Sequence, residues 1–197
     1  MKQIINLNCP GCGAPVSTEQ EICMYCQRPI VIASFSDVQS MPPVELNKYA
    51  NAYRKALSEN PDNQEINTSI AFCYLRLKLY DKALSAFEKA MEDNFDNSET
   101  FFYAAICVLG GKKAFLVQRT EIDKIEEYVN AAMMIEPRGI YHYFIAYIKY
   151  DYFERKFFST SPTYREALAN ANDAGVSPSD IEQLFGVLGV PRPDALS

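Results

Sequence analysis

Long apolar runs are absent from this sequence. None of its 197 residues falls in an uninterrupted apolar stretch of about 18 residues or more, the length of a membrane-spanning helix. The first residues, MKQIINLNCPGC, also lack the basic start, apolar stretch and small-residue cleavage site of a signal peptide. We therefore expect a soluble, cytoplasmic protein that makes no contact with a membrane.

Side chains suited to catalysis are scarce. The single histidine, His142, lies in a segment rich in Tyr and Phe, and the sequence supplies no evident partner for acid–base chemistry. Walker, Rossmann, HExxH and GxSxG patterns are absent. Cys73 and Cys107 occupy equivalent helical positions, where packing explains them better than nucleophilic reactivity. We predict that the protein is not an enzyme and has no catalytic residues.

The cysteines instead indicate a metal site. Four of the six form two CxxC pairs, Cys9 with Cys12 and Cys23 with Cys26. Two such turns can direct four thiolates at one ion, and four sulfur ligands leave no open position for a reacting water. The pattern predicts one structural Zn²⁺ bound by Cys9, Cys12, Cys23 and Cys26. Iron in a rubredoxin-like site is the alternative, because the same ligands could hold it.

With these cysteines, residues 1–34 resemble the zinc ribbons found at the N-termini of many prokaryotic proteins. Residues 29–33, Pro-Ile-Val-Ile-Ala, are expected to form a short strand that closes the module. Residues 35–43 form a predicted linker, which is short and only partly polar. We hypothesise that the ribbon packs against the segment that follows instead of standing free.

The rest of the chain repeats itself. An offset of 34 residues places Lys55-Ala56 over Lys89-Ala90 and Cys73 over Cys107. Apolar residues within each unit recur with a helical period, which predicts two helices per repeat. The D-x-x-E patterns beginning at Asp62 and Asp96 predict helix starts, and Asp81 is placed to cap another helix.

Residues 64–97 resemble a tetratricopeptide repeat. The large, small and aromatic signature positions of that family are filled by Ile70, Ala71, Tyr74, Ala83, Phe87 and Ala90. The segment departs from the family at Asn67, where Trp is favoured, and at Phe95, where Pro is favoured. The resemblance implies a mainly α fold, an α-solenoid of helical hairpins over residues 44–176, joined to a small N-terminal β zinc ribbon. The repeat at residues 98–139 is lengthened by an insertion near residues 110–117.

The last segment, residues 177–197, is predicted to form a capping helix and tail. Ser177 is placed to cap this helix and Pro178 stands in its first turn. An apolar face follows, formed by Ile181, Leu184, Phe185 and Leu188. Because the ends of a solenoid expose an apolar face, we expect this helix to cover one of them.

The family resemblance also implies a concave groove lined by the first helix of each repeat. Carried over, the protein-binding positions are Phe72, Phe102, Ile106, Tyr141, Phe144 and Ile148. Such an apolar groove suits a protein or peptide that presents an apolar or amphipathic segment. The chain's own C-terminal helix could fill the groove instead, and the basic and apolar insertion at residues 110–117 is a second candidate contact. The resulting hypothesis is a non-enzymatic protein–protein interaction adaptor or scaffold.

An alternative is a nucleic-acid-associated regulator whose zinc ribbon contacts DNA or RNA. The charge disfavours it, because 25 acidic and 19 basic residues leave a net charge of −6, and nucleic-acid affinity depends on Lys and Arg. Within the ribbon, the cations Lys2 and Arg28 are matched by Glu19 and Glu21.

Overall fold

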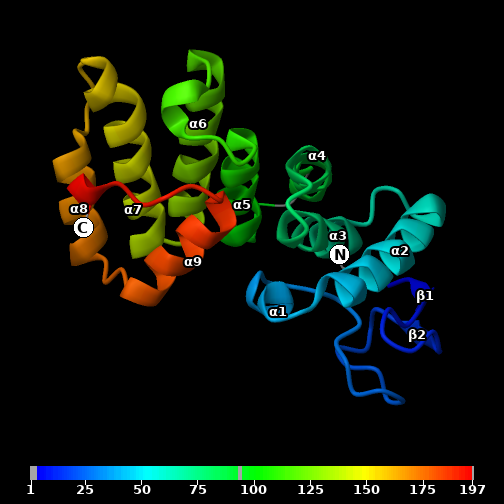
Figure 1. The fold of residues 1–197 in the computed structure, drawn as a ribbon. Coiled ribbons are helices and arrows are strands. Elements are labelled where there is room, and N and C mark those ends of the chain that lie inside the picture. Colours follow the sequence, from blue (N-terminus) through cyan, green and yellow to red (C-terminus); the bar gives the residue numbers. More distant parts are fainter. Residues whose placement is uncertain (1–3, 93–94, 197) are drawn as a thin grey trace. The chain divides into compact units, whose positions relative to one another are not determined.

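The computed structural model describes residues 4–92 and 95–196, which form mostly α-helices (Figure 1). None of the described helices combines the length and apolar character needed to cross a membrane. Helices with the prefix η are 3₁₀ turns, except for η2, which is π-helical. In chain order the elements are β1 (Asn6–Asn8), β2 (Pro15–Ser17), α1 (Ser36–Gln39), α2 (Pro43–Glu59), α3 (Gln64–Arg76), α4 (Tyr80–Met91), α5 (Ser98–Leu109), η1 (Ala114–Leu116), α6 (Arg119–Ile135), α7 (Gly139–Ile148), η2 (Lys149–Phe153), η3 (Glu154–Lys156), α8 (Tyr164–Asp173), α9 (Pro178–Leu188) and η4 (Asp194–Leu196).

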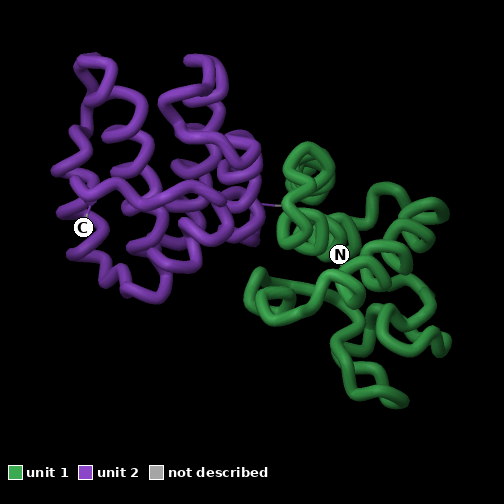
Figure 2. The backbone as a smooth tube through the Cα atoms, viewed as in Figure 1, with its two compact units in different colours: residues 1–94 green, residues 95–197 purple. Residues whose placement is uncertain are grey.

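The chain divides into two compact units, residues 1–94 and residues 95–197 (Figure 2). Unit 1 contains the N-terminal module together with α1–α4, and unit 2 contains α5–α9. The segment boundaries predicted from the sequence, after residues 34, 43 and 176, stay predictions. Residues 1–3 of the predicted ribbon, which include Lys2, and residue 197 of the predicted tail lie outside the described residues.

Antiparallel helical hairpins are the main building block of both units. Helix α3 packs against α4, α5 against α6, and α7 against α8. Gly139 permits the last of these contacts, because a Cβ atom there would lie 2.6 Å from the backbone nitrogen of Val176 and 2.9 Å from the carbonyl oxygen of Ala171. The predicted fold class, mainly α with helical hairpins and a small N-terminal β module, is confirmed.

The helices α3 and α5 begin one residue later than the sequence patterns predict. The Asn63 side chain accepts a hydrogen bond from the Ile66 N–H at 3.0 Å, and Asn97 accepts one from the Glu99 N–H at 3.0 Å. The predicted caps, Asp62 and Asp96, are therefore wrong by one position. Asn and Asp cap about equally well, so local sequence does not decide between neighbours.

At α3, hydrogen bonds from a side chain four residues after the cap decide its position. The Asn67 side chain donates to the carbonyl oxygens of Pro61 at 2.8 Å and Asn63 at 3.0 Å. These bonds fix the turn before the helix so that Asn63 stands at its start. Asn67, which replaces the Trp of the family pattern, therefore has a structural role that the pattern does not show.

Two further predicted caps have different outcomes. Asp81 lies inside the first turn of α4, whose N-cap is Leu79 and makes no side-chain capping bond, so that prediction is wrong. Ser177 does cap α9, because its hydroxyl accepts from the Asp180 N–H while Asp180 accepts from the Ser177 N–H. Pro178 occupies the first turn as predicted.

The N-terminal module is a small antiparallel hairpin, in which Leu7 of β1 pairs with Val16 of β2. Residues 29–33 do not form the predicted closing strand, and Pro29 makes only an isolated bridge to Ile22. The side chains of Ile30 and Ile32 are fully buried. The prediction fails because hydroxyl groups from α2 and α3 bond this backbone in place of a neighbouring strand.

Ser69 of α3 makes the central contact to this segment. Its hydroxyl accepts a hydrogen bond from the Ile32 N–H at 3.0 Å and lies 3.0 Å from the Ile32 carbonyl oxygen. The same hydroxyl lies 2.8 Å from the Glu65 carbonyl oxygen, so its single proton serves one of two acceptors. Ser69 is fully buried, and no water can replace it as a partner for the Ile32 N–H.

Residues 35–43, the predicted linker, are partly helical and packed. Val38 of α1 is fully buried, and the Phe35 ring lies 6.4 Å from the ring of Phe72 on α3. The Arg76 side chain donates to the Gln39 carbonyl oxygen at 3.1 Å. This segment therefore covers part of α3.

Replacing Asn63 should show which residue caps α3. Asn63→Ala removes the bond to Ile66 and should lower the free energy of unfolding by about 1–2 kcal/mol. Asp62→Ala, the matched control one residue earlier, should change it much less, because Asp62 makes no capping bond. Urea denaturation followed by circular dichroism measures both, and a larger loss for Asp62→Ala would contradict the assignment.

Replacing Ser69 should test the attachment of the N-terminal module to the helices. Ser69→Ala leaves the buried Ile32 N–H without its partner and should cost about 1–3 kcal/mol of stability. Ser85→Ala on α4 is the control, since Ser85 is exposed. Amide hydrogen exchange should also become faster at Ile32, and unchanged protection there would show that the bond does not hold the segment.

Candidate metal centre and groove residues

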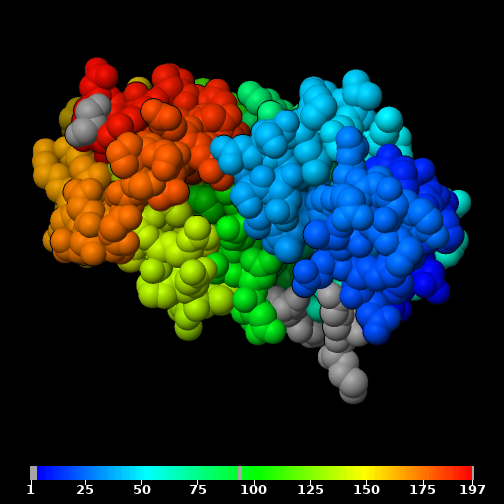
Figure 3. Space-filling view, turned by 90° about the horizontal axis from the view of Figure 1, so that it is seen from below, coloured from blue at the N-terminus to red at the C-terminus, as the bar shows by residue number. Residues whose placement is uncertain are grey.

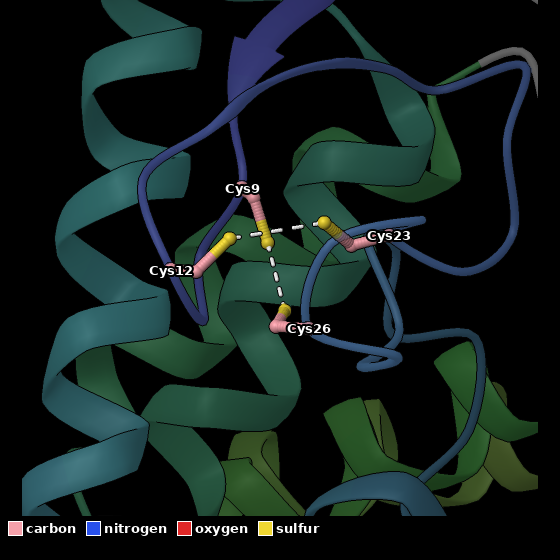
Figure 4. A group of neighbouring side chains, drawn as sticks. All are labelled: Cys9, Cys12, Cys23 and Cys26. Carbon is pink, nitrogen blue, oxygen red and sulfur yellow. Dashed lines mark hydrogen bonds between the residues drawn. The ribbon is translucent and has the colours of Figure 1, made fainter.

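The two CxxC turns bring four sulfur atoms together (Figure 4). Cys9 Sγ lies 3.6 Å from Cys26 Sγ, and Cys12 Sγ lies 3.8 Å from Cys23 Sγ. All four sulfur atoms lie within 4.8 Å of one another. Within the described residues, no other group of three or more Cys, His, Asp or Glu side chains is placed to hold a metal ion.

Both turns have the same backbone pattern. In the first, the Gly13 N–H bonds the Cys9 carbonyl at 2.8 Å and the Cys9 N–H bonds the Ala14 carbonyl at 2.7 Å. In the second, the Gln27 N–H bonds the Cys23 carbonyl and the Cys23 N–H bonds the Arg28 carbonyl, each at 2.9 Å. The turns are therefore equivalent, although only the first contains glycines, Gly11 and Gly13.

The fifth position of each turn adopts a left-handed backbone conformation. Gly13 has a φ of 82°, which glycine tolerates without steric cost. Gln27 stands at the equivalent position with a φ of 59°, and its side chain donates to the Met24 carbonyl oxygen at 3.1 Å. That bond stabilises a conformation that the sequence does not predict for Gln27.

Backbone N–H groups are directed at the sulfur atoms. Burial raises the pKa of the Cys9 thiol to about 12, although the N–H groups of Cys12 and Gly11 oppose the shift. Burial also acts on Cys23, but there the N–H groups of Cys26 and Tyr25 prevail and lower its pKa to about 7. Hydrogen bonds of this kind favour the thiolate form, which is the form that binds metal.

The spacing of the sulfur atoms fits a tetrahedral metal site. Four ligands at a Zn–S distance of about 2.3 Å lie about 3.8 Å from one another. The Cys9–Cys26 and Cys12–Cys23 distances agree with this value. Four thiolates around one ion leave no open position, so the donor set fits a structural role.

The other two cysteines are part of the core. Cys73 on α3 is fully buried and Cys107 on α5 is 2% exposed. Burial raises the pKa of the Cys73 thiol to about 12, which keeps it protonated and unreactive at neutral pH. Both positions therefore support packing, as the sequence predicts.

The predicted groove residue of unit 1, Phe72, lies in the core. Its ring contacts Phe87 at 5.3 Å and Phe35 at 6.4 Å, and its side chain is fully buried. A partner could touch Phe72 only after residues 35–39 had moved. The prediction that Phe72 binds a partner therefore stays a prediction.

The predicted groove residues of unit 2 are buried as well. Phe102 packs on Tyr141 at 4.6 Å and on Phe144 at 5.7 Å, and Ile106 and Ile148 are fully buried. Phe102 on α5 thus packs against Tyr141 and Phe144 on α7, and all five side chains lie in the core. Their role in binding a partner also stays a prediction.

Helix α9 covers part of the same two helices. The Phe185 ring lies 5.5 Å from Tyr147, and Gln183 donates to the Tyr103 hydroxyl at 3.0 Å. Figure 3 shows α9 and the C-terminal segment, orange to red, on the surface of unit 2. A segment of the chain itself thus packs on α5 and α7 through Tyr103 and Tyr147. The alternative that this helix fills the predicted groove stays a prediction.

An open groove lies elsewhere in unit 1, between the β-hairpin and α2. Its volume is about 870 Å³, with hairpin residues on one side and α2 residues on the other. The α2 side presents Lys48, Asn51 and Lys55, and the hairpin presents Asn6 and Asn8. Sequence reasoning missed this groove, although the polar stripe of α2 recurs with a helical period.

Helix α2, which lines this groove, and the two helices that follow it match a known family. A profile of the tetratricopeptide repeat family matches residues 50–100, which run from the middle of α2 into α5. The chain contains tetratricopeptide repeats. The repeat formed by α3 and α4 is held by small and aromatic signature residues, since Ala71, Ala83 and Phe87 are fully buried.

A solved structure named MamA MSR-1 C2 is similar to this repeat-containing chain. The two have a TM-score of 0.50 and 19% sequence identity, and the similarity covers 76% of this chain and 73% of that one. At this identity the similarity shows the fold alone. A search of curated proteins finds no match.

Metal analysis should distinguish the four clustered cysteines from the two that are buried on α3 and α5. The purified chain should contain one zinc ion, and Cys9→Ser/Cys23→Ser should contain none, because two of four ligands are lost. Cys73→Ala/Cys107→Ala, the matched control, should keep the ion. Elemental analysis by mass spectrometry measures this, and stoichiometric iron would favour the rubredoxin-like alternative.

Proposed function

We propose that this chain is a non-enzymatic protein-interaction scaffold, in which a structural zinc ribbon and the first tetratricopeptide helices form a peptide-binding groove. The observation that carries the proposal is the open groove of about 870 Å³ between the β-hairpin and α2. Grooves of this size accept several side chains of a partner. Tetratricopeptide repeats support a role in binding other proteins.

The groove lining favours an extended peptide with acidic side chains. Lys48 and Lys55 are exposed, and within the described residues neither has an ion-pair partner. Glu59 is the one acidic residue among those that line the groove. The surplus of positive charge is complementary to carboxylates, in contrast to the apolar partner expected from the buried positions.

The hairpin can contribute backbone hydrogen bonds. The Thr18 N–H bonds the Ile5 carbonyl and the Cys9 N–H bonds the Ala14 carbonyl, so alternate residues of β1 face β2. The backbone groups of Asn6 and Asn8 then point away from β2. An extended peptide can pair with such an edge, which provides affinity that does not depend on sequence.

The metal has a structural part in this proposal. Cys9, Pro10 and Gly11 of the first CxxC turn line the groove, and Cys23 and Cys26 would share their ion. A bound zinc ion would hold the turn in place, since a module of this size has little core of its own. No step of catalysis is assigned to it.

The nucleic-acid alternative has less support. It would rest on the same Lys48 and Lys55, but a net charge of −6 and one nearby Glu59 oppose a polyanion. Among the described residues of the predicted ribbon, Arg28 is the only cation, and it pairs with Glu45 at 2.5 Å.

Peptide display should test the proposed groove. The wild-type chain, used to select from a random peptide library, should enrich peptides with Asp or Glu. Lys48→Glu/Lys55→Glu should bind the selected peptides about tenfold more weakly or worse, because attraction becomes repulsion. Fluorescence anisotropy with a labelled selected peptide measures the affinity.

The control variant is Lys82→Glu/Lys89→Glu on α4. It makes the same change in charge, at the same spacing of seven residues, on another helix of unit 1. It should bind like the wild type. Equal losses in both variants would show a general charge effect, and preferential binding of a labelled oligonucleotide at low salt would favour the alternative function.

A further inference from the structure

Two lengthened connections meet at one end of unit 2. The α5–α6 connection and the α7–α8 connection lie at the same end of these helices, the upper end in Figure 1. Their contact is direct, because the Arg155 guanidinium lies 4.6 Å and Lys156 Nζ lies 5.0 Å from the centre of the Phe115 ring. This end is termed the basic-aromatic end, and it comprises the exposed side chains of Lys112, Lys113, Leu116, Phe157 and Phe158 and the half-buried side chain of Lys156.

Large apolar side chains at this end face the solvent. Phe157 is 95% exposed, Leu116 is 68% exposed and Phe158 is 52% exposed. Single exposed apolar residues are common, but three on adjoining connections form a patch that an isolated chain gains nothing by exposing. Such a patch indicates a contact with something outside the chain.

The backbone of Phe157 strengthens this argument. Its φ is 59°, in the left-handed region, where the Phe157 N–H bonds the Glu154 carbonyl and the Phe158 N–H bonds the Phe153 carbonyl. Glycine or asparagine usually occupies this position at a helix end. A phenylalanine at this position is unfavourable in two ways, because its backbone is strained and its ring is exposed to water. Within the described residues, the ring makes no aromatic contact that would compensate.

Positive charge surrounds the exposed rings. Lys112, Lys113 and Lys156 have no ion-pair partner within the described residues, and Lys156 Nζ lies 3.8 Å from the centre of the Tyr152 ring. Among nearby acidic residues, Asp151 pairs with Arg155 and Asp123 pairs with Arg119. Glu154 is the remaining exposed acid in these connections. Exposed Asp194 lines one cavity with Lys113, but Arg192 lines it too and balances that charge, so the end is locally cationic on a chain of net charge −6.

We propose that the basic-aromatic end binds the surface of an anionic lipid bilayer. Phe157 and Leu116 would enter the interfacial region, while the lysines would lie among the anionic headgroups. A lipid surface is favoured over a peptide because the apolar side chains project outward from two separate connections. The lack of a long apolar run in the sequence predicts no contact with a membrane. A peripheral contact of this kind needs no spanning helix, so that observation does not bear on it.

Vesicle binding tests this proposal with the full chain. The chain should co-sediment with vesicles of phosphatidylcholine and phosphatidylglycerol much more strongly than with phosphatidylcholine alone, and less strongly at high salt. Phe157→Asn should weaken partitioning by about tenfold or more, since a large apolar side chain is lost. Asparagine tolerates the left-handed backbone, so this variant should keep or exceed wild-type thermal stability.

A fluorescent variant gives a second readout. The chain has no tryptophan, so Phe157→Trp introduces a single reporter at the proposed contact. Its emission should shift to shorter wavelength when anionic vesicles are added. An unchanged spectrum at vesicle concentrations that bind the chain would place the contact elsewhere and overturn the proposal.

Two further variants complete the test. Lys112→Glu/Lys113→Glu should lose the preference for anionic vesicles, whereas Met134→Ser, which changes an 88% exposed residue outside this end, should bind like the wild type. The proposal is overturned if the wild type does not bind anionic vesicles or if Phe157→Asn binds them equally well. A loss of self-association in Phe157→Asn without vesicle binding would assign the patch to a second copy of the chain.

Discussion

Three side-chain hydroxyl groups hold the backbone of residues 29–32 against the first helices, and much of unit 1 depends on them. Tyr49 donates to the Pro29 carbonyl at 3.2 Å and Tyr53 donates to the Ile30 carbonyl at 2.9 Å. Ser69 bonds the backbone of Ile32. Burial raises the pKa of both tyrosines, so their hydroxyls stay protonated and remain donors at neutral pH. Because this segment follows the second CxxC turn directly, the hydroxyls also fix where the sulfur cluster lies relative to α2.

The same attachment explains why the open surface of unit 1 is not the one that the repeat pattern predicts. Residues 35–39 continue from the fixed segment and cover Phe72, which removes it from solvent. The hairpin is left beside α2, where its polar residues and the lysines of that helix line the groove. The same hydrogen bonds thus lead to the burial of Phe72 and to the open groove between the hairpin and α2. In unit 2, surface of the helices is covered in another way, by the packing of α9 on α5 and α7.

The sequence alone was sufficient to predict a feature wherever the residues that form it lie close together along the chain. The CxxC spacing specifies two turns that can share an ion, and the structure brings their four sulfur atoms within 4.8 Å. Helical periodicity and the signature residues predicted the α3–α4 hairpin, because one buried face per helix is enough to determine it. Ser177 was identified as a cap for the same reason. At the start of α3 the local signal was ambiguous, because Asp62 and Asn63 could serve equally well as caps, and the nearby side chain of Asn67 decided between them.

The amino-acid sequence by itself determined which four cysteines come together as candidate metal ligands, and it also determined the helical hairpins and the repeat family, since each depends on spacing along the chain. Tertiary structure alone decided which apolar positions are buried, because Phe72 and Phe144 are indistinguishable from groove residues until the segments packed on them are known. It also decided that residues 29–33 pack without a strand, since their partners lie on α2 and α3. Finally, it placed Phe115 of the first lengthened connection against Arg155 and Lys156 of the second, because hairpins that alternate in direction bring every second connection to the same end.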